Sequence, residues 1–293
     1  MNYKELKEKE PIYVIGHSNP DLDTIVSSIL MSKIFNNLGI KAYYSIIDSN
    51  YDIDNYNLNM LNDCISDYTP VVIKKRDILK YNYFIVDHND PIQSVGYDAN
   101  IVGGMDHHED SKQLNNIILN NYSCNSLYIY DYFKDNYEFT KADKYAIFLA
   151  TLNDTMFYKN SRYKKEEQAL IDSLGFKENV QLYFDKYFIN PDFEKGMKYI
   201  LSIGEKNYKY NNVEFSSCVV KVRNIDQKRM NDFVNEIKNT NKNILGIWMN
   251  VDNNYTKVFF KINDKIIKFN YDFLASRAKT VIKDVFKYLN NFT

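Results

Sequence analysis

The chain has 293 residues, 45% of them hydrophobic and 26% charged, which is long enough for two domains that each bury a core. It has no run of about 18 apolar residues and no N-terminal signal pattern, so we expect a cytoplasmic protein without a membrane span. The formal net charge is −1 and no dense run of Lys and Arg is present, which argues against binding of long nucleic acids.

The two halves of the chain differ in charge. Residues 196–293 contain 17 basic and 9 acidic side chains, whereas residues 1–195 contain 20 basic and 29 acidic ones. Two interpretations are open. In the first, the charges of both halves simply lie on solvated surfaces. In the second, the acidic half holds cations, and the basic half binds an anion that is attached to those cations. The motifs described next favour the second interpretation.

The first motif follows the first predicted strand. Residues 12–15 form an apolar run that stops at a glycine, and the loop behind it reads His17-Ser18-Asn19-Pro20-Asp21-Leu22-Asp23. In open α/β sheets, ligands gather at the carboxyl ends of strands, and His with Asp is a donor set that divalent first-row cations accept. His17, Asp21 and Asp23 are therefore predicted metal ligands.

The following elements repeat this arrangement. Residues 20–38 have the apolar spacing of a helix and residues 41–47 that of a strand. Two further apolar runs, 83–86 and 101–105, are each followed by an Asp-His pair, and these two motifs contain the other three histidines of the chain: Asp87-His88 and Asp106-His107-His108. Strands that alternate with helices predict an α/β fold with a mostly parallel, doubly wound sheet, so the motifs would meet at one edge.

A long helical pattern over residues 140–158 includes Asn153-Asp154-Thr155. A carboxylate among apolar neighbours is unfavourable to bury unless it is hydrogen-bonded, paired or bound to metal. Asp154 alone would suit a structural role. Beside three other clusters, it becomes a predicted metal ligand.

The second half of the chain predicts a smaller α+β domain. Residues 164–188 look helical, and Pro191 marks a linker, so we expect domains over 1–188 and 196–293 joined by residues 189–195. Strands are predicted over 208–222 with a turn at Asn211-Asn212, and over 244–251, 256–262 and 265–270, with helices over 193–203, 226–238 and 279–289.

The predicted ligands suit a pair of metal ions. Two divalent ions that share one carboxylate need about this many donors, and such a pair stabilises an in-line displacement at phosphorus. Mixed imidazole and carboxylate ligation suits Mn²⁺, with Co²⁺, Zn²⁺ or Fe²⁺ as alternatives, whereas Mg²⁺ is better suited to the substrate oxygens. The six donors come from four separate strand or helix ends: His17, Asp21, Asp23, Asp87, His107 and Asp154.

The motifs at residues 16–23, 87–89, 106–108 and 153–155 resemble the four motifs of the DHH phosphoesterase superfamily. Their order and spacing look most like the manganese-dependent (family II) inorganic pyrophosphatases, and the resemblance covers nearly the whole chain. It implies an N-terminal DHH domain, a C-terminal DHHA2 domain, an active site in the cleft between them and a homodimer.

The resemblance also implies a role for each site residue. One metal would be bound by His17, Asp21 and Asp87, and the other by Asp23, Asp87, His107 and Asp154, so that Asp87 bridges them. His108 matches the residue that contacts the substrate and donates a proton to the leaving phosphate, while His88 and Asp106 would orient the ligands. The residues that match the family's phosphate-binding positions are Lys206, Arg277 and Lys279.

The implied reaction is hydrolysis of Mg²⁺-bound pyrophosphate to two phosphates, with a hydroxide that bridges two Mn²⁺ as the nucleophile. The chain departs from the family pattern at Asn153, where the family has Ser, at Ala278, where it has a phosphate-binding Lys, and at Thr280, where it has Gln. Two alternatives therefore stay open. One is a DHH-type phosphoesterase acting on a short oligonucleotide, a cyclic dinucleotide or polyphosphate, although the Gly-Gly-Gly-His motif of the nucleotide-hydrolysing relatives is absent. The other is a catalytically weak relative that senses an anion.

Overall fold

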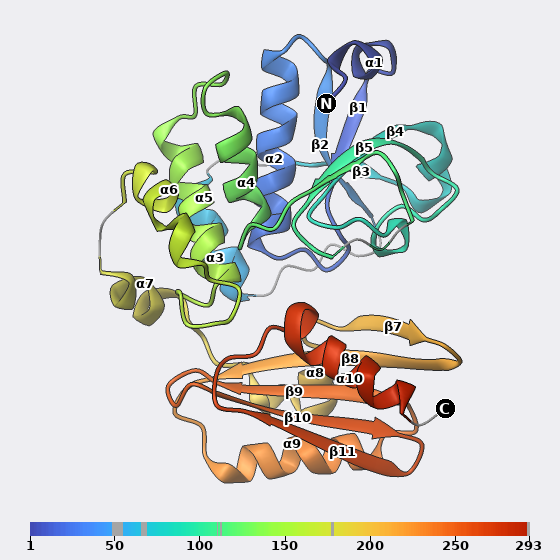
Figure 1. The fold of residues 1–293 in the computed structure, drawn as a ribbon, viewed down its shortest axis with the longest axis vertical. Helices are drawn as coiled ribbons and strands as arrows, with labels where there is room; N and C mark the ends of the chain where they lie inside the picture. The colour runs from blue at the N-terminus through green and yellow to red at the C-terminus, as the bar shows by residue number, and fades with distance from the viewer. Residues whose placement is uncertain (49–54, 66–68, 110, 112, 177–178, 292–293) are drawn as a thin grey trace. The chain divides into compact units, whose positions relative to one another are not determined.

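The computed structural model describes residues 1–48, 55–65, 69–109, 111, 113–176 and 179–291. The chain divides into two compact units (Figure 1). The first comprises Met1–Tyr158 and Tyr163–Tyr187, and the second comprises Lys159–Arg162 and Phe188–Thr293.

The first unit is built on a six-stranded sheet of order β3-β2-β1-β4-β5-β6 in which every pair of neighbours is parallel. This confirms the predicted α/β fold with a mostly parallel sheet. The chain runs outward from β1 in one direction and returns to start again at β4, so the strand order reverses between β1 and β4, where ligands bind in folds of this type. The strands are β1 (Ile12–Ile15), β2 (Ala42–Ile47), β3 (Val71–Ile73), β4 (Asn82–Val86), β5 (Asn100–Asp106) and β6 (Ile117–Leu119).

Helix α2 is the central helix of this unit. Thirteen of its sixteen residues are buried, because it packs against β2, α4 and α5, which stand beside it in Figure 1. Its serines are tolerated there since Ser28 and Ser32 donate their hydroxyls to backbone carbonyls one turn earlier. The helices are α1 (Tyr3–Glu8), α2 (Leu22–Asn37), α3 (Asn55–Cys64), α4 (Asn125–Phe133), α5 (Lys141–Asp154), α6 (Gln168–Ser173) and α7 (Val180–Tyr187).

The second unit holds a five-stranded mixed sheet of order β11-β10-β9-β8-β7, in which only β8 and β9 run parallel. Gly246 allows α9 to approach this sheet closely, since a Cβ there would lie 2.3 Å from Ile237 Cδ1. The predicted turn at Asn211 is confirmed, with a left-handed backbone that Asn tolerates. The elements are α8 (Met197–Ser202), β7 (Lys206–Tyr210), β8 (Val213–Val222), α9 (Gln227–Asn239), β9 (Ile244–Asn250), β10 (Tyr255–Ile262), β11 (Lys265–Tyr271) and α10 (Ile282–Asn290).

The last helix begins later than the sequence predicts. α10 starts at Ile282 instead of Lys279, because residues 277–281 form a π-helical turn. The carbonyl of Ser276 accepts the N–H groups of both Thr280 and Val281, at 3.0 and 3.1 Å, which widens the turn. None of the helices within the described residues has the length and apolarity needed to cross a membrane.

Candidate metal centre

The carboxyl ends of β1, β4 and β5 bring the predicted ligands together. His17 follows β1, Asp87 follows β4 directly, and His107 comes directly after β5. Helix termini supply the rest: Asp21 caps α2, Asp23 lies in its first turn, and Asp154 ends α5. Within the described residues, three groups have one ligand atom per residue within 4.8 Å of one another. Two consist of predicted ligands alone: His17, Asp21 and Asp87, and Asp23, His107 and Asp154. The third adds His108 to Asp87 and His107.

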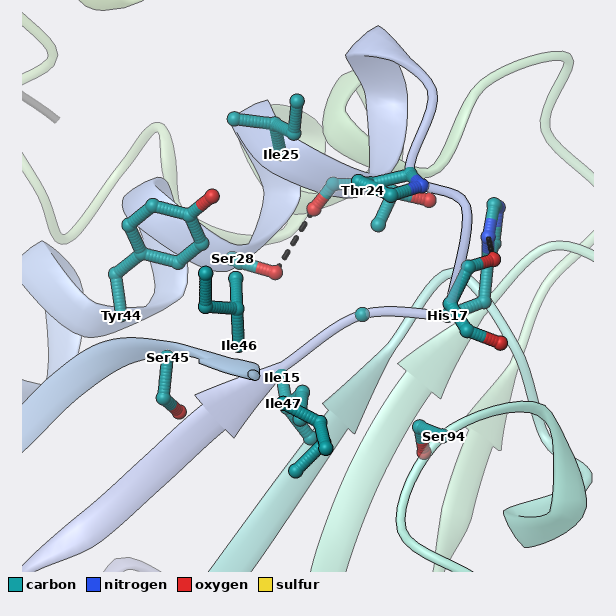
Figure 2. Close-up of a pocket in the computed structure, with 13 residues that line it drawn as sticks. Ile15, His17, Thr24, Ile25, Ser28, Tyr44, Ser45, Ile46, Ile47 and Ser94 are labelled. Atoms are coloured by element: carbon teal, nitrogen blue, oxygen red, sulfur yellow. Dashed lines mark hydrogen bonds between the residues drawn. The ribbon is translucent and has the colours of Figure 1, made fainter. Parts of the chain in front are cut away.

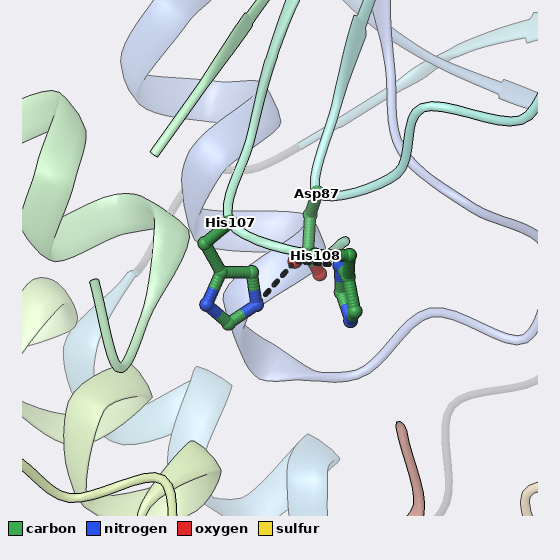
Figure 3. A group of neighbouring side chains, drawn as sticks. All are labelled: Asp87, His107 and His108. Carbon is green, nitrogen blue, oxygen red and sulfur yellow. Dashed lines mark ion pairs between the residues drawn. The ribbon is translucent and has the colours of Figure 1, made fainter. Parts of the chain in front are cut away.

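Asp87 lies between two histidines. Its Oδ1 is 3.2 Å from His107 Nε2, and its Oδ2 is 3.5 Å from His17 Nε2. Further carboxylates surround each imidazole, since His107 Nε2 is 3.5 Å from Asp154 Oδ2 and His17 Nε2 is 3.7 Å from Asp21 Oδ2. Figure 3 shows Asp87 between the strand-end histidines His107 and His108. One carboxylate that faces two ligand groups is the arrangement of a bridging ligand.

Backbone carbonyls set the orientation of both buried histidines. His17 Nδ1 lies 2.9 Å from the carbonyl oxygen of Ser18, and His107 Nδ1 lies 3.1 Å from that of Tyr122. Because a carbonyl only accepts, each Nδ1 carries the proton and each Nε2 presents its lone pair to the carboxylates. This is the tautomer that binds a metal through Nε2.

Three buried atoms at this centre have no hydrogen-bond partner among the described residues: His17 Nε2, His107 Nε2 and Asp87 Oδ1. Buried polar atoms are rarely left in this state, since each loses its hydration without compensation. All three are electron-pair donors, so they require a hydrogen-bond donor or a cation. The donor set therefore fits divalent cations such as Mn²⁺.

The backbone of Asp87 is also unusual. Its φ is +59°, a left-handed conformation that is uncommon outside glycine, and Thr24 Oγ1 donates a hydrogen bond of 2.6 Å to its Oδ2. Gly16 permits this contact, because a Cβ at that position would lie 2.1 Å from the Thr24 methyl carbon. The end of β1, the start of α2 and the end of β4 therefore fix Asp87 together.

Asp23 is held by the first turn of α4. Its carboxylate accepts the backbone N–H groups of Asn125, at 2.6 Å, and Ser126, at 2.8 Å. Burial, and next the charge of Asp87, raise the pKa of Asp23 to about 6. Burial and the charge of Asp21 likewise raise the pKa of Asp87 well above its ordinary value. Bound cations would stabilise the ionised form of both carboxylates.

His108 differs from the buried histidines because 21% of its side chain is exposed. Its Nδ1 lies 2.8 Å from Asp106 Oδ1, and the same oxygen accepts the backbone N–H of His107 at 2.8 Å. Burial raises the pKa of Asp106, but the charge and hydrogen bond of His108 outweigh burial and leave the pKa below its ordinary value. Asp106 therefore stays ionised and orients His108.

His88 lies outside the groups of close ligand atoms. Its Nδ1 is 2.8 Å from the carbonyl oxygen of Val86, and its Nε2 is 2.7 Å from Ser94 Oγ. Both ring nitrogens are used in these contacts, which fix the backbone on either side of Asp87.

A small cavity lies beside His17, between the end of β1, α2 and β2 (Figure 2). Its volume of about 30 Å³ gives room for about one water molecule. The hydroxyls of Ser28 and Ser45 donate to backbone carbonyls instead of offering donors to the cavity. The space behind His17 is therefore too small to be a phosphate site.

The predicted phosphate-binding residues belong to the second unit. The guanidinium of Arg277 donates to the carbonyl of Gly204 and lies 3.3 Å from Ser217 Oγ, and Ser217 pairs with Lys206 across β7 and β8. Arg277 and Lys206 are thus linked through Ser217. Lys279 lies in the π-helical turn, and its side chain is outside the described residues.

Comparison with known proteins identifies the first unit. Residues 11–152 match the family model described as DHH family, N-terminal domain. Residues 11–152 form a DHH family domain. Within it lie the Asp-His-His run at residues 106–108 and five of the six predicted ligands, and the sixth, Asp154, follows two residues later.

Part of the chain is also similar in sequence to a curated protein. A curated relative from Clostridium acetobutylicum, a probable manganese-dependent inorganic pyrophosphatase, is 26% identical over 171 residues. The match covers 56% of this chain and spans about half, 54%, of that relative's length.

Solved structures show the same fold over nearly the whole chain. A putative family II inorganic pyrophosphatase from Methanococcus jannaschii superposes with a TM-score of 0.77 at 17% identity, covering 95% of this chain and 99% of that one. An exopolyphosphatase-related protein from Bacteroides fragilis has a TM-score of 0.50 at 14% identity, covering 99% and 95%. The DHH domain with a second mixed-sheet unit is therefore the fold of family II pyrophosphatases.

Several residues that shape the centre were not predicted from the sequence. Thr24, which holds Asp87, stands directly behind the first motif without being one of its ligand types. The N–H groups of Asn125 and Ser126 act through the backbone, which leaves no residue signature. The structure also gives a partner to Asn153, one of the departures from the family pattern, since its side-chain amide donates to Asn57 Oδ1, which also accepts the N–H of Leu22.

Proposed function

We propose that this protein hydrolyses inorganic pyrophosphate to two phosphates by a two-metal mechanism. The observation that carries the proposal is the position of Asp87 between His17 and His107. At this centre, three buried atoms that can donate an electron pair to a metal have no hydrogen-bond partner within the described residues. The name of the Clostridium acetobutylicum relative supports both pyrophosphate as the substrate and manganese as the metal.

Each cation would be held by one of the two groups that consist of predicted ligands alone. His17, Asp21 and Asp87 would bind one Mn²⁺, while Asp23, His107 and Asp154 would bind the other together with Asp87. Co²⁺ suits the same donors, and Mg²⁺ would arrive with the substrate. When bound, two such ions would activate water as the nucleophile near neutral pH and would offset the charge that develops on the phosphoryl oxygens.

His108 is the proposed proton donor to the leaving phosphate. It is partly exposed, so a substrate can reach it, and the Asp106 carboxylate at 2.8 Å favours the protonated imidazole. A protonated imidazole within reach of the leaving oxygen acts as a general acid. Lys206, Arg277 and Lys279 would bind the phosphate oxygens, with Arg277 offering a planar fork of donors.

A second candidate keeps the metal centre and changes the substrate to polyphosphate or a short nucleotide. Ala278 favours it, because the residue that matches a phosphate-binding lysine carries no charge in this chain. Loss of one ammonium weakens the neutralisation of a compact, highly charged ion such as pyrophosphate more than that of a phosphodiester, which carries less charge at each phosphorus.

Phosphate release by the purified chain tests both candidates. The protein is stripped of metal and reloaded with Mn²⁺ or Co²⁺ in the presence of Mg²⁺, and it is then given pyrophosphate, a short polyphosphate or a dinucleotide. The proposal predicts rapid, metal-dependent release from pyrophosphate. Release from another substrate alone would favour the second candidate, and no release with both ions bound would contradict both and leave the anion-sensing alternative.

A further inference from the structure

The segment of residues 122–126, which runs from the loop after β6 into the first turn of α4, contacts two ligands of one proposed cation. The carbonyl oxygen of Tyr122 lies 3.1 Å from His107 Nδ1, and the N–H groups of Asn125 and Ser126 bind the carboxylate of Asp23 at 2.6 and 2.8 Å. A shift of this segment would therefore move an imidazole and a carboxylate of the same site together.

Glu167 holds this segment from a distance of 44 residues along the chain. Its side chain is buried, and both carboxylate oxygens lie 3.1 Å from the backbone nitrogen of Ser123. The hydroxyl of Ser123, which is fully buried, donates to the same carboxylate. Lys164 Nζ lies 3.9 Å from one of its oxygens and offsets part of the charge. No metal-ligand group that the structure describes includes Glu167.

We propose that Glu167 is a positioning residue for the cation bound by Asp23, His107 and Asp154. The inference rests on the proposed function, because it assumes that the centre binds metal. Without the carboxylate, Ser123 would have two buried donors to satisfy, and each buried donor without a partner is strongly unfavourable.

An open pocket next to Glu167 would let the segment of residues 122–126 move if the Glu167 carboxylate were lost. The pocket of about 590 Å³ is lined by Tyr122, Glu167, Leu170 and their neighbours, so water could reach Ser123 if the segment moved toward it. The ligand group that contains His17 and Asp21 is anchored without the segment of residues 122–126. His17 Nδ1 lies against the carbonyl of Ser18, and Asp21 accepts the N–H of Thr24. Loss of the Glu167 carboxylate should therefore weaken the binding of the ion held by Asp23, His107 and Asp154, and leave the binding of the other ion unchanged.

The test measures Mn²⁺ binding to the metal-stripped full chain by calorimetry and by the electron paramagnetic resonance signal of paired Mn²⁺. Glu167→Gln keeps the shape of the side chain but directs an amide N–H₂ at one of the Ser123 donors. We expect about tenfold weaker binding of one ion, loss of the paired signal at two equivalents, and unchanged binding of the other ion. Ser123→Ala should affect the same ion by a smaller factor.

Glu166→Gln is the matched control, because Glu166 is the exposed neighbour that lines the same pocket. It should bind both ions like the wild type. Wild-type affinities for both ions in Glu167→Gln and Ser123→Ala would overturn the inference, even if the thermal midpoint of the metal-free variants fell, because that result shows a purely structural role. If Glu167→Gln does not fold, Mn²⁺ binding to Ser123→Ala alone tests the inference, and wild-type affinity for both ions would overturn it. A wild-type chain that binds no pair of ions would overturn the proposed function as well.

Discussion

At the scale of single residues, the centre depends on how one carboxylate is shared. Asp87 presents one oxygen to His17 and the other to His107 while its backbone adopts a left-handed conformation. The sequence predicted the ligand types and their order, because His and Asp at strand ends carry a recognisable pattern. It could not predict the contacts of Thr24 or of the α4 amides, which depend on where the chain folds back.

Asp87→Asn tests the bridging role. The amide has nearly the shape of the carboxylate but lacks the charge needed between two cations, so pyrophosphatase activity should fall at least about 100-fold and the paired Mn²⁺ signal should disappear. Because burial and Asp21 raise the pKa of Asp87, the metal-free variant should be at least as stable to urea as the wild type. Full activity with two ions bound would refute the bridging assignment.

The pH dependence of metal binding follows from the same carboxylates. The pKa of Asp23 is about 6 in the metal-free fold, and that of Asp87 is also raised, whereas both groups must be ionised to bind Mn²⁺. Binding should therefore release protons, and affinity should rise as the pH increases from 5 to 7. Calorimetry in two buffers with different ionisation enthalpies measures this release. Proton uptake on binding would have the opposite sign and would contradict the account.

At the scale of elements, local patterns predicted the strands and helices that carry ligands. The predicted positions of β1, β4, β5, α2 and α5 were close to the observed ones, because the strands are continuous apolar runs and the helices have apolar residues at helical spacing. The predicted start of α10 at Lys279 was wrong. The Ser276 carbonyl accepts two N–H groups, and this creates a π-helical turn that apolar spacing does not reveal. Helix α4 was not predicted, although its first turn fixes Asp23.

Gly16→Ala tests the contact between the end of β1 and α2. A Cβ at this position would lie 2.1 Å from the Thr24 methyl carbon, so the helix start must move and Thr24 must release Asp87. We expect a loss of about 1–3 kcal/mol in the free energy of unfolding, measured with urea, together with weaker Mn²⁺ binding. Gly103→Ala is the control, because the nearest atom to its Cβ would be in the Phe84 ring at 3.1 Å and none of the three nearest atoms belongs to a metal ligand, so it should leave Mn²⁺ binding intact.

At the scale of the whole molecule, the charges divide between the two units. The metal ligands lie in the acidic part of the chain, and the proposed phosphate-binding residues Lys206 and Arg277 lie in the basic part. The sequence predicted this division from composition and motifs. It could not predict that Arg277 and Lys206 are linked through Ser217, because that contact joins elements 60 residues apart.

Ala278→Lys tests whether the phosphate-binding set is incomplete. An added ammonium that reaches a phosphate oxygen should raise kcat/KM for pyrophosphate about tenfold, which corresponds to about 1.4 kcal/mol for a charge-assisted hydrogen bond. Ala278→Leu adds a side chain without charge and should bring no gain. An unchanged rate in Ala278→Lys would show that Arg277 and Lys279 already neutralise the substrate.

The most direct test of the two-metal account is the rate of pyrophosphate hydrolysis as Mn²⁺ is added to the metal-stripped chain in measured equivalents, with Mg²⁺ held constant. We predict little phosphate release after the first equivalent and a steep rise that is complete at two equivalents per chain, together with the paired Mn²⁺ signal. Full activity at one equivalent, or no activity when two ions are bound, would contradict the account.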